Sequence, residues 1–327
     1  MRLIIDCDPG NGVPGANVDD GLALALALAA KPQLDLELIG IVAGNTPREV
    51  GFAAAGELLR QTGYRVPLAL GAARALIEPP APWRAHLDRP IADPHLASLW
   101  DGVPRPQAAA LPAPDAAIAI GELICNNPGE ITLAAIGPLT NVAQALQLYP
   151  QMAQAVKEIV IMGGVFNVEG YIKDTNFGLD PEAAQQVLSS GANITLAPLD
   201  VTTQTMLTQE DLARLTQPDT PLCRYLRATT QPWIDYSRQT RHLPGCWIHD
   251  ALVIAWLLEP QLVTTEEYFV DVALEGAMTR GSSRRWQPGS LRLTVGMPEP
   301  QGKPVRVMRQ VDNARLLALI GATLARG

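Results

Sequence analysis

Cysteine is scarce in this sequence. The 327-residue chain has four cysteines, and no two of them form a C-x-x-C pair. Cysteines scattered in this way suit neither the framework of a disulfide-rich secreted domain nor a tetrahedral zinc site. Long apolar runs are missing as well, because no stretch approaches the roughly 18 uninterrupted apolar residues that read as a transmembrane helix. We therefore expect reduced thiols and no membrane insertion.

Positive charge is also limited. The sequence has 25 Lys and Arg against 33 Asp and Glu, a formal net charge of −8, and it contains no basic run. A protein that neutralises phosphates along a nucleic acid needs the opposite balance, so no nucleic-acid partner is expected. The first apolar stretch, Leu3–Ile5, is too short for the apolar region of a signal peptide, which predicts a cytoplasmic location.

Short apolar runs alternate with longer amphipathic ones through the first two-thirds of the chain. This alternation is typical of βα units and predicts an α/β fold with an open, mostly parallel, Rossmann-like sheet and flanking helices, as a single domain over residues 1–327. The predicted strands are Leu3–Ile5, Leu36–Ala43, Val66–Leu70, Ile131–Ala135, Ile159–Met162 and Ile194–Ala197, and the predicted helices are Asp20–Ala30, Pro47–Gln61, Ala116–Asn126, Asn141–Leu148 and Pro181–Ser189.

The C-terminal third adds further helices and β elements. Helices are expected at Gln209–Leu215, Leu222–Tyr236, Ile248–Leu258 and Asn313–Leu324, and strands at Tyr268–Leu274, Leu291–Val295 and Val305–Gln310. The segment Pro79–Pro114 is rich in Pro, His, Arg and Asp and has no clear periodicity. A loop of this length is either functional or a surface excursion.

Four carboxylates gather near the first predicted strand. Asp6 and Asp8 stand at its end, one residue apart and therefore on one face, and Asp19 and Asp20 begin the next helix. Ligands of open α/β sheets bind beyond the carboxyl ends of the strands. Four neighbouring carboxylates repel one another unless a cation or shared protons compensate, and an all-oxygen set selects Ca²⁺ or Mg²⁺ over zinc. The alternative is a tight turn after the strand and an N-cap at Asp19.

A family resemblance sharpens this hypothesis. Asp6-Cys7-Asp8-Pro9-Gly10 followed by Asp19-Asp20 resembles the D-x-D-P-G-x-D-D signature of the inosine-uridine preferring nucleoside hydrolases. Further segments agree in order over essentially the whole chain. They are Ile41–Asn45 (V-x-G-N), Ile136–Asn141 (G-P-L-T-N), Met162–Gly164, Asp174–Asn176 and Asp180–Ala183 (M-G-G, E-F-N and D-P-E-A), His249–Ala251 (H-D-P/A) and Thr279–Gly281 (T-R-G).

Three features depart from the family pattern. Eight residues, 11–18, replace the usual single residue between P-G and D-D, which lengthens the loop beside the acids. Asp174 replaces the family's Glu and is one methylene shorter. The glycine-rich, histidine-containing segment that many members carry after the third strand is not evident.

The resemblance implies Ca²⁺-dependent hydrolysis of the N-glycosidic bond of ribonucleosides, giving free base and ribose. Asp8, Asp20 and Asp250 would bind the ion with their carboxylates, helped by the backbone carbonyl of Ile136, and water and two sugar hydroxyls would complete the coordination. Asp8 would take a proton from the attacking water, and the transition state would resemble an oxocarbenium ion.

The resemblance also implies which residues bind the substrate. His249 would assist departure of the base, and the helical region before the H-D motif would contact the base, with Tyr236 and His242 as candidates. Tyr236 suits a core position equally well, whereas Trp247 is expected in the core. The expected contacts to the ribose are Asp19, Asp174, Asn176, Asn45 and, more weakly, Asn167.

Two alternatives stand beside this hypothesis. Haloacid-dehalogenase-like phosphatases also place D-x-D after the first strand, but Thr or Val usually follows two residues after the second Asp, where this chain has Gly10. A non-catalytic nucleoside- or sugar-binding protein would keep the cation site, yet no expected catalytic residue is missing here. The sequence leaves purine and pyrimidine substrates open, and the resemblance implies a homodimer or homotetramer.

Overall fold

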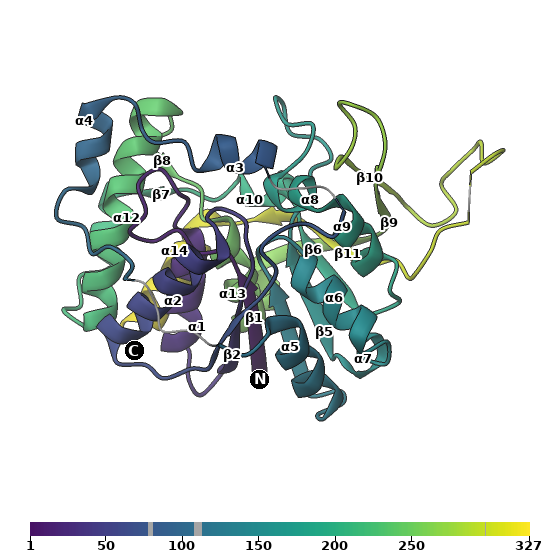
Figure 1. Ribbon diagram of the computed structural model, residues 1–327, viewed down its shortest axis with the longest axis horizontal. Coiled ribbons are helices and arrows are strands. Elements are labelled where there is room, and N and C mark those ends of the chain that lie inside the picture. The colour runs from purple at the N-terminus through teal and green to yellow at the C-terminus, as the bar shows by residue number, and fades with distance from the viewer. Residues whose placement is uncertain (78–80, 108–112, 298) are drawn as a thin grey trace.

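A nine-stranded sheet forms the centre of the molecule in the computed structural model, which describes residues 1–77, 81–107, 113–297 and 299–327. The strand order is β10-β9-β11-β6-β5-β4-β1-β2-β3 (Figure 1), in which β9 runs antiparallel to both of its neighbours, β10 and β11, and the other pairings are parallel. The predicted α/β fold with a mostly parallel sheet is confirmed. The strands are β1 (Arg2–Cys7), β2 (Asp35–Ile41), β3 (Leu68–Leu70), β4 (Ile131–Ala135), β5 (Glu158–Met162), β6 (Ile194–Ala197), β9 (Val263–Val272), β10 (Ser283–Trp286) and β11 (Val305–Val311), and β7 (Leu207–Thr208) pairs separately with β8 (Gly245–Cys246).

Helices cover both faces of this sheet. Leu3, Ile5 and Cys7 of β1 face one apolar core and Ile4 faces the other, as the two-residue period of a strand requires. In Figure 1, α1, α2 and α12 lie to the left of β1 and α5, α6 and α7 to its right. The helices are α1 (Asp19–Ala29), α2 (Arg48–Thr62), α3 (Ala81–Leu87), α4 (Pro94–Ala97), α5 (Ala116–Cys125), α6 (Thr140–Leu148), α7 (Met152–Ala155), α8 (Thr175–Leu179), α9 (Pro181–Leu188), α10 (Leu199–Thr202), α11 (Gln209–Leu215), α12 (Pro221–Thr240), α13 (His249–Leu258) and α14 (Asn313–Leu324).

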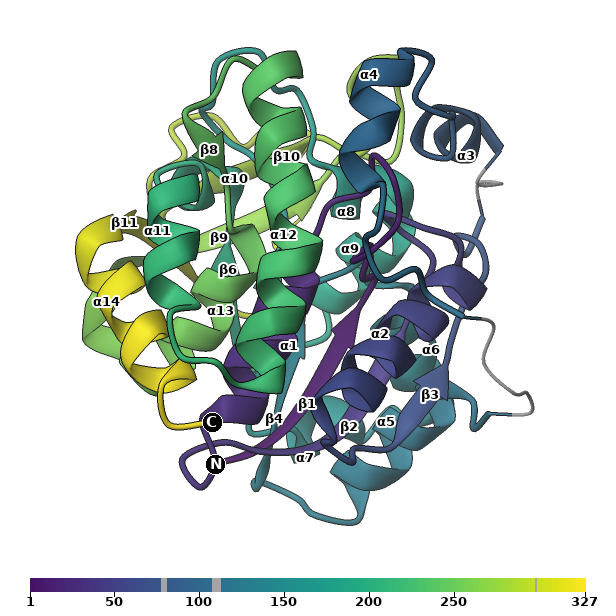
Figure 2. The ribbon, with the colours of Figure 1, turned by 90° about the vertical axis from the view of Figure 1, so that its left-hand side faces the viewer.

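The helix α1 is buried along its whole length, as expected of a helix that is apolar all round. It packs beside α13, whose residues are also almost entirely buried. Figure 2 shows the same molecule turned by 90°, with α12 and α14 beside α1. After β1 the chain adds β2 and β3 on one side of this strand and then β4, β5 and β6 on its other side. The carboxyl end of β1 is therefore the topological switch point, where α/β sheets bind ligands.

Two expectations in the second half were wrong in position. Residues 291–295 lie exposed and form no strand, and the strand that pairs with β9 is instead Ser283–Trp286. The strand expected at Tyr268–Leu274 begins earlier, at Val263, because it pairs with β11 along a polar stretch whose residues 264–267 are all exposed.

The long segment expected without regular structure contains short helices. In its described part, α3, α4 and a 3₁₀ turn at Ser98–Trp100 follow one another, whereas residues 79, 80 and 108–112 lie outside the described part. Figure 1 shows α3 above the upper end of the sheet. Across the described chain, every helix is too short or too polar to cross a membrane.

Candidate active site

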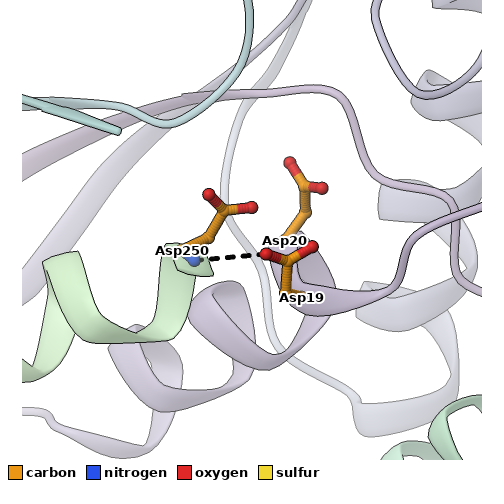
Figure 3. A group of neighbouring side chains, drawn as sticks. All are labelled: Asp19, Asp20 and Asp250. Atoms are coloured by element: carbon orange, nitrogen blue, oxygen red, sulfur yellow. Dashed lines mark hydrogen bonds between the residues drawn. The ribbon is translucent and has the colours of Figure 1, made fainter. Parts of the chain in front are cut away.

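Three carboxylates meet at the carboxyl edge of the sheet. Asp19 and Asp20 open α1 and Asp250 is the second residue of α13, so the packing of these helices brings their first turns together. One carboxylate oxygen from each of the three lies within 4.8 Å of the others, and all three residues are buried (Figure 3). The Asp250 amide donates to Asp19 Oδ2 at 3.3 Å. Helix N-termini carry a partial positive charge, which favours carboxylates there.

Asp8 adjoins this trio through Asp20 and Asn45. The Asp8 amide donates to Asp20 Oδ1 at 2.9 Å, and the Asn45 amide donates to Asp8 Oδ2 at 2.6 Å. The Asn45 side chain donates to Asp20 Oδ2 at 3.1 Å. A β-carbon at Gly44 would stand 1.9 Å from Asp8 Oδ2, so only glycine permits this approach. The V-x-G-N segment thus holds two acids in place.

Within the described part of the chain, little positive charge offsets the carboxylates of this cluster. Burial raises the pKa of Asp8 and Asp19 to about 7, and burial followed by repulsion from neighbouring carboxylates raises those of Asp20 and Asp250 well above the usual range. Arg84 of α3 donates to the Gly44 carbonyl and is the cation that acts on Asp8.

A divalent cation fits this oxygen-only set. Asp19 Oδ1 is buried and has no hydrogen-bond partner among the described residues. An uncompensated buried carboxylate is costly, and a hard cation with six to eight oxygen ligands removes that cost. Ile136 lines the cavity described below, and its carbonyl accepts from Asn176 Nδ2 at 2.8 Å, which leaves one of its two lone pairs free of that bond.

A cavity of about 500 Å³ opens above the acids. Asp19, Asp250 and Ile136 are among the residues that line it. Asp174 and Asn176 flank it from the start of α8, where Asp174 Oδ2 caps the helix by accepting from the Phe177 amide at 3.1 Å. Asp174 Oδ1 has no partner among the described residues, and burial raises the pKa of this group to about 6. Polar groups able to hold a sugar therefore face the cavity beside the acids.

Aromatic rings and a histidine also line the cavity. The rings of Trp247 and His249 are 5.7 Å apart, and the guanidinium of Arg241 lies 4.8 Å from the centre of the Trp233 ring. His249 Nδ1 lies 2.7 Å from Thr202 Oγ1. Burial, with Arg241 as a second cause, lowers the pKa of His249 to about 3, so its imidazole is neutral at physiological pH.

Comparison with known proteins decides the family. Residues 3–318 match the family of inosine-uridine preferring nucleoside hydrolases. The chain belongs to this family. Membership makes the protein a nucleoside hydrolase and leaves the phosphatase alternative without support.

Relatives and solved structures agree with this membership. The nucleoside hydrolase is 35% identical over 306 residues to the non-specific ribonucleoside hydrolase RihC of Salmonella agona, covering 91% of this chain and 93% of the relative. It is similar to the plant nucleoside hydrolase PpNRh1 (28% identity, TM-score 0.83) and to a purine-preferring ribonucleoside hydrolase from Gardnerella vaginalis (26% identity, TM-score 0.78). Each alignment covers 99% of this chain and 98% of the other.

Three expected substrate residues of the nucleoside hydrolase lie away from the cavity. The ring of Tyr236 stacks on Trp233 and meets the edge of Trp100, both at 5.6 Å, so it forms part of the apolar core. His242 is exposed on a separate surface hollow, because α12 ends at Thr240 and the left-handed backbone at His242 (φ 54°) turns the chain there. Asn167 is also exposed, and its amide donates to Asp200 Oδ1.

Other residues, which the sequence did not single out as substrate contacts, line the cavity. Trp247, expected in the core, lines the cavity together with Trp233, Arg241 and Lys173, and so does the segment 15–17 of the lengthened loop. The position of Trp247 two residues before the H-D motif was a usable signal. Trp233 and Tyr236 share one side of α12, and their spacing alone does not say which ring reaches the cavity.

Proposed function

We propose that this nucleoside hydrolase cleaves the N-glycosidic bond of ribonucleosides with the help of Ca²⁺ and releases free base and ribose. One observation carries the proposal: two members of a buried carboxylate cluster, Asp19 and Asp250, line a cavity that is also lined by tryptophan rings and His249. A ribonucleoside has the matching polarity, with a hydroxyl-rich sugar at one end and a planar base at the other. The name of the relative RihC points to ribonucleosides as well.

The acids and one carbonyl are the proposed cation ligands. Asp8, Asp20 and Asp250 would hold Ca²⁺ with their carboxylates, and Ile136 would add its main-chain oxygen. Asp19 lies close enough to two of these acids to share in the site. When bound, the ion would lower the pKa of a coordinated water and fix two hydroxyls of the sugar.

The chain's own residues carry the remaining steps. Asp8 takes the proton of the attacking water, whose oxygen forms the new bond to the sugar carbon as the bond to the base nitrogen breaks. The electron pair of the broken bond leaves with the base, and His249 stabilises that charge by donating a hydrogen bond. Asp19, Asp174 and Asn176 hold the ribose hydroxyls, and the carboxylates stabilise the positive charge that develops on the sugar.

The aromatic part of the cavity lining is the proposed base site. Trp233 and Trp247 offer ring faces to a planar base, and Arg241 offers hydrogen-bond donors. Because stacking does not distinguish the bases strongly, this arrangement favours a broad substrate range. Assembly as a homodimer or homotetramer and a cytoplasmic location stay predictions.

The deciding experiment measures release of reducing sugar from inosine, adenosine, guanosine, uridine and cytidine, without phosphate and with or without a Ca²⁺ chelator. We expect hydrolysis that the chelator abolishes and that added Ca²⁺ restores. Asp8→Asn is expected to lose activity on every substrate, whereas Asp101→Asn on the surface keeps it. Hydrolysis unaffected by the chelator would contradict the proposed role of the acids, and binding without hydrolysis would favour the non-catalytic alternative.

A further inference from the structure

A buried hydroxyl, that of Thr202, contacts the ring of His249. Thr202 is the last residue of α10, fully buried, and its Oγ1 lies 2.7 Å from Nδ1 of His249, the first residue of α13. The imidazole has a second nitrogen, Nε2, and the ring lines the substrate cavity. Nδ1 is thus held by the protein, whereas Nε2 has no hydrogen-bond partner among the described residues.

The surrounding threonines differ from Thr202 in their partners. Thr203 Oγ1 donates to the Leu199 carbonyl at 2.7 Å, the usual bond of a threonine to its own helix. Thr205 Oγ1 donates to the Thr202 carbonyl at 2.6 Å and accepts from the Ile248 amide at 3.0 Å. The hydroxyl of Thr202 pairs with the imidazole instead. The chain around α10 therefore fixes the start of α13 at two points, one on the backbone and one on the ring.

The number of protons available decides which group donates in the hydrogen bond between Thr202 Oγ1 and His249 Nδ1. If Nδ1–H donated to the hydroxyl, the hydroxyl proton would have no acceptor among the described residues in a buried place, which is costly. If the hydroxyl donates to Nδ1, both groups are satisfied, and the neutral ring then carries its proton on Nε2.

We propose that Thr202 is a positioning residue that fixes His249 in the tautomer with the proton on Nε2. The Nε2–H then faces the cavity as a donor to the departing base. This inference rests on the proposed function, because the base is its acceptor. Without the Thr202 hydroxyl, the tautomer with the proton on Nδ1 becomes accessible, and the lone pair of Nε2 would face the negative charge on the base instead of a donor.

The kinetic test compares Thr202→Val with Thr202→Ser. Loss of the group that orients a metal-binding histidine typically costs about 10- to 100-fold. For Thr202→Val we expect a fall of similar size, about 10- to 100-fold, in kcat on inosine with KM nearly unchanged. p-Nitrophenyl riboside, whose leaving group needs no such help, should be turned over at close to the wild-type rate. Thr202→Ser should restore most of the activity, and the control Thr203→Val should resemble the wild type on both substrates.

The outcomes separate this proposal from a structural role. Equal losses on both substrates, or failure of Thr202→Ser to restore activity, would overturn it. The ¹⁵N chemical shifts of the His249 ring report the tautomer directly and need no turnover, so they remain informative if the wild type hydrolyses no riboside. We expect protonated Nε2 and unprotonated Nδ1 in the wild type and in Thr202→Ser. Protonated Nδ1 in the wild type would refute the inference.

Discussion

Replacing Asp19 with asparagine is expected to stabilise the protein at neutral and alkaline pH when a chelator keeps metal away. Burial, reinforced by Asp20, raises the pKa of Asp19 to about 7, whereas a carboxyl in the unfolded chain titrates near 4. Protonated Asp19 thus favours the folded state below about pH 4, and that contribution is lost as the pH rises through about 7. Asparagine has no charge to bury at any pH, so the variant avoids this loss.

The size of the effect follows from the pKa difference. A difference of about 3 between the folded and unfolded states corresponds to about 4 kcal/mol above pH 7, at about 1.4 kcal/mol per pKa unit. In a protein of this size each kcal/mol shifts the unfolding temperature by about 2 °C. Asp19→Asn should therefore unfold up to about 8 °C higher than the wild type at pH 8, and at nearly the same temperature at pH 4.

Thermal unfolding followed by circular dichroism between pH 4 and pH 8.5 measures this difference. Asp101→Asn, a change of the same kind on the surface, is the matched control and should follow the wild type. Added Ca²⁺ should raise the unfolding temperature of the wild type most at high pH and that of Asp19→Asn less. A difference between Asp19→Asn and the wild type that does not grow with pH would refute the idea that these carboxylates form an uncompensated cation site.

Other predictions concern turnover. Gly44→Ala should abolish it, because the new β-carbon would displace the Asp8 carboxylate; a riboside assay with a normal far-ultraviolet spectrum checks this, and unchanged activity would contradict the geometry. His249→Ala should slow inosine hydrolysis about 100-fold but spare p-nitrophenyl riboside, and equal losses on both would indicate a purely positional role. Replacing residues 11–18 by a single residue should change KM, because this loop lines the cavity; identical kinetics on every substrate would exclude a role for it.

Some elements could be predicted to the residue, because local signals define their ends. The helix expected at Gln209–Leu215 has those bounds, and Thr208 and Asp211 form a capping box at its start. The helix Asn313–Leu324 also has the expected bounds, and Asp312 caps it by accepting from two backbone amides. Each signal lies within a few residues of the end that it marks, so one sequence is enough to read it.

The prediction of a strand at Leu291–Val295 was wrong because a strand needs a neighbouring strand with which to form hydrogen bonds. The alternation of apolar and polar residues there is regular, but pairing depends on which segment reaches the free side of β9, and Ser283–Trp286 reaches it. The sequence pattern carries no information about this competition. The same limit explains why β9 begins at Val263, in a polar stretch that is stabilised by β11.

Part of the candidate site could likewise be predicted from the sequence, and part could not. Asp8, Asp19 and Asp20 could be predicted from the residues alone, because they follow a recognisable strand. Asp250 is contributed by a distant helix and was reached through the family resemblance. The base site could not be predicted, since the choice between Trp233 and Tyr236 depends on how α12 is rotated against its neighbours.

The meeting of α1 and α13 also sets an order of events during synthesis. Asp250 stands 231 positions after Asp19, to which its amide donates. A ribosome therefore completes most of the parallel sheet while Asp8, Asp19 and Asp20 still await their fourth member. The ion we propose cannot guide the early folding of the nascent chain through this cluster. It binds the complete cluster only after α13 has docked, and it then stabilises the folded state.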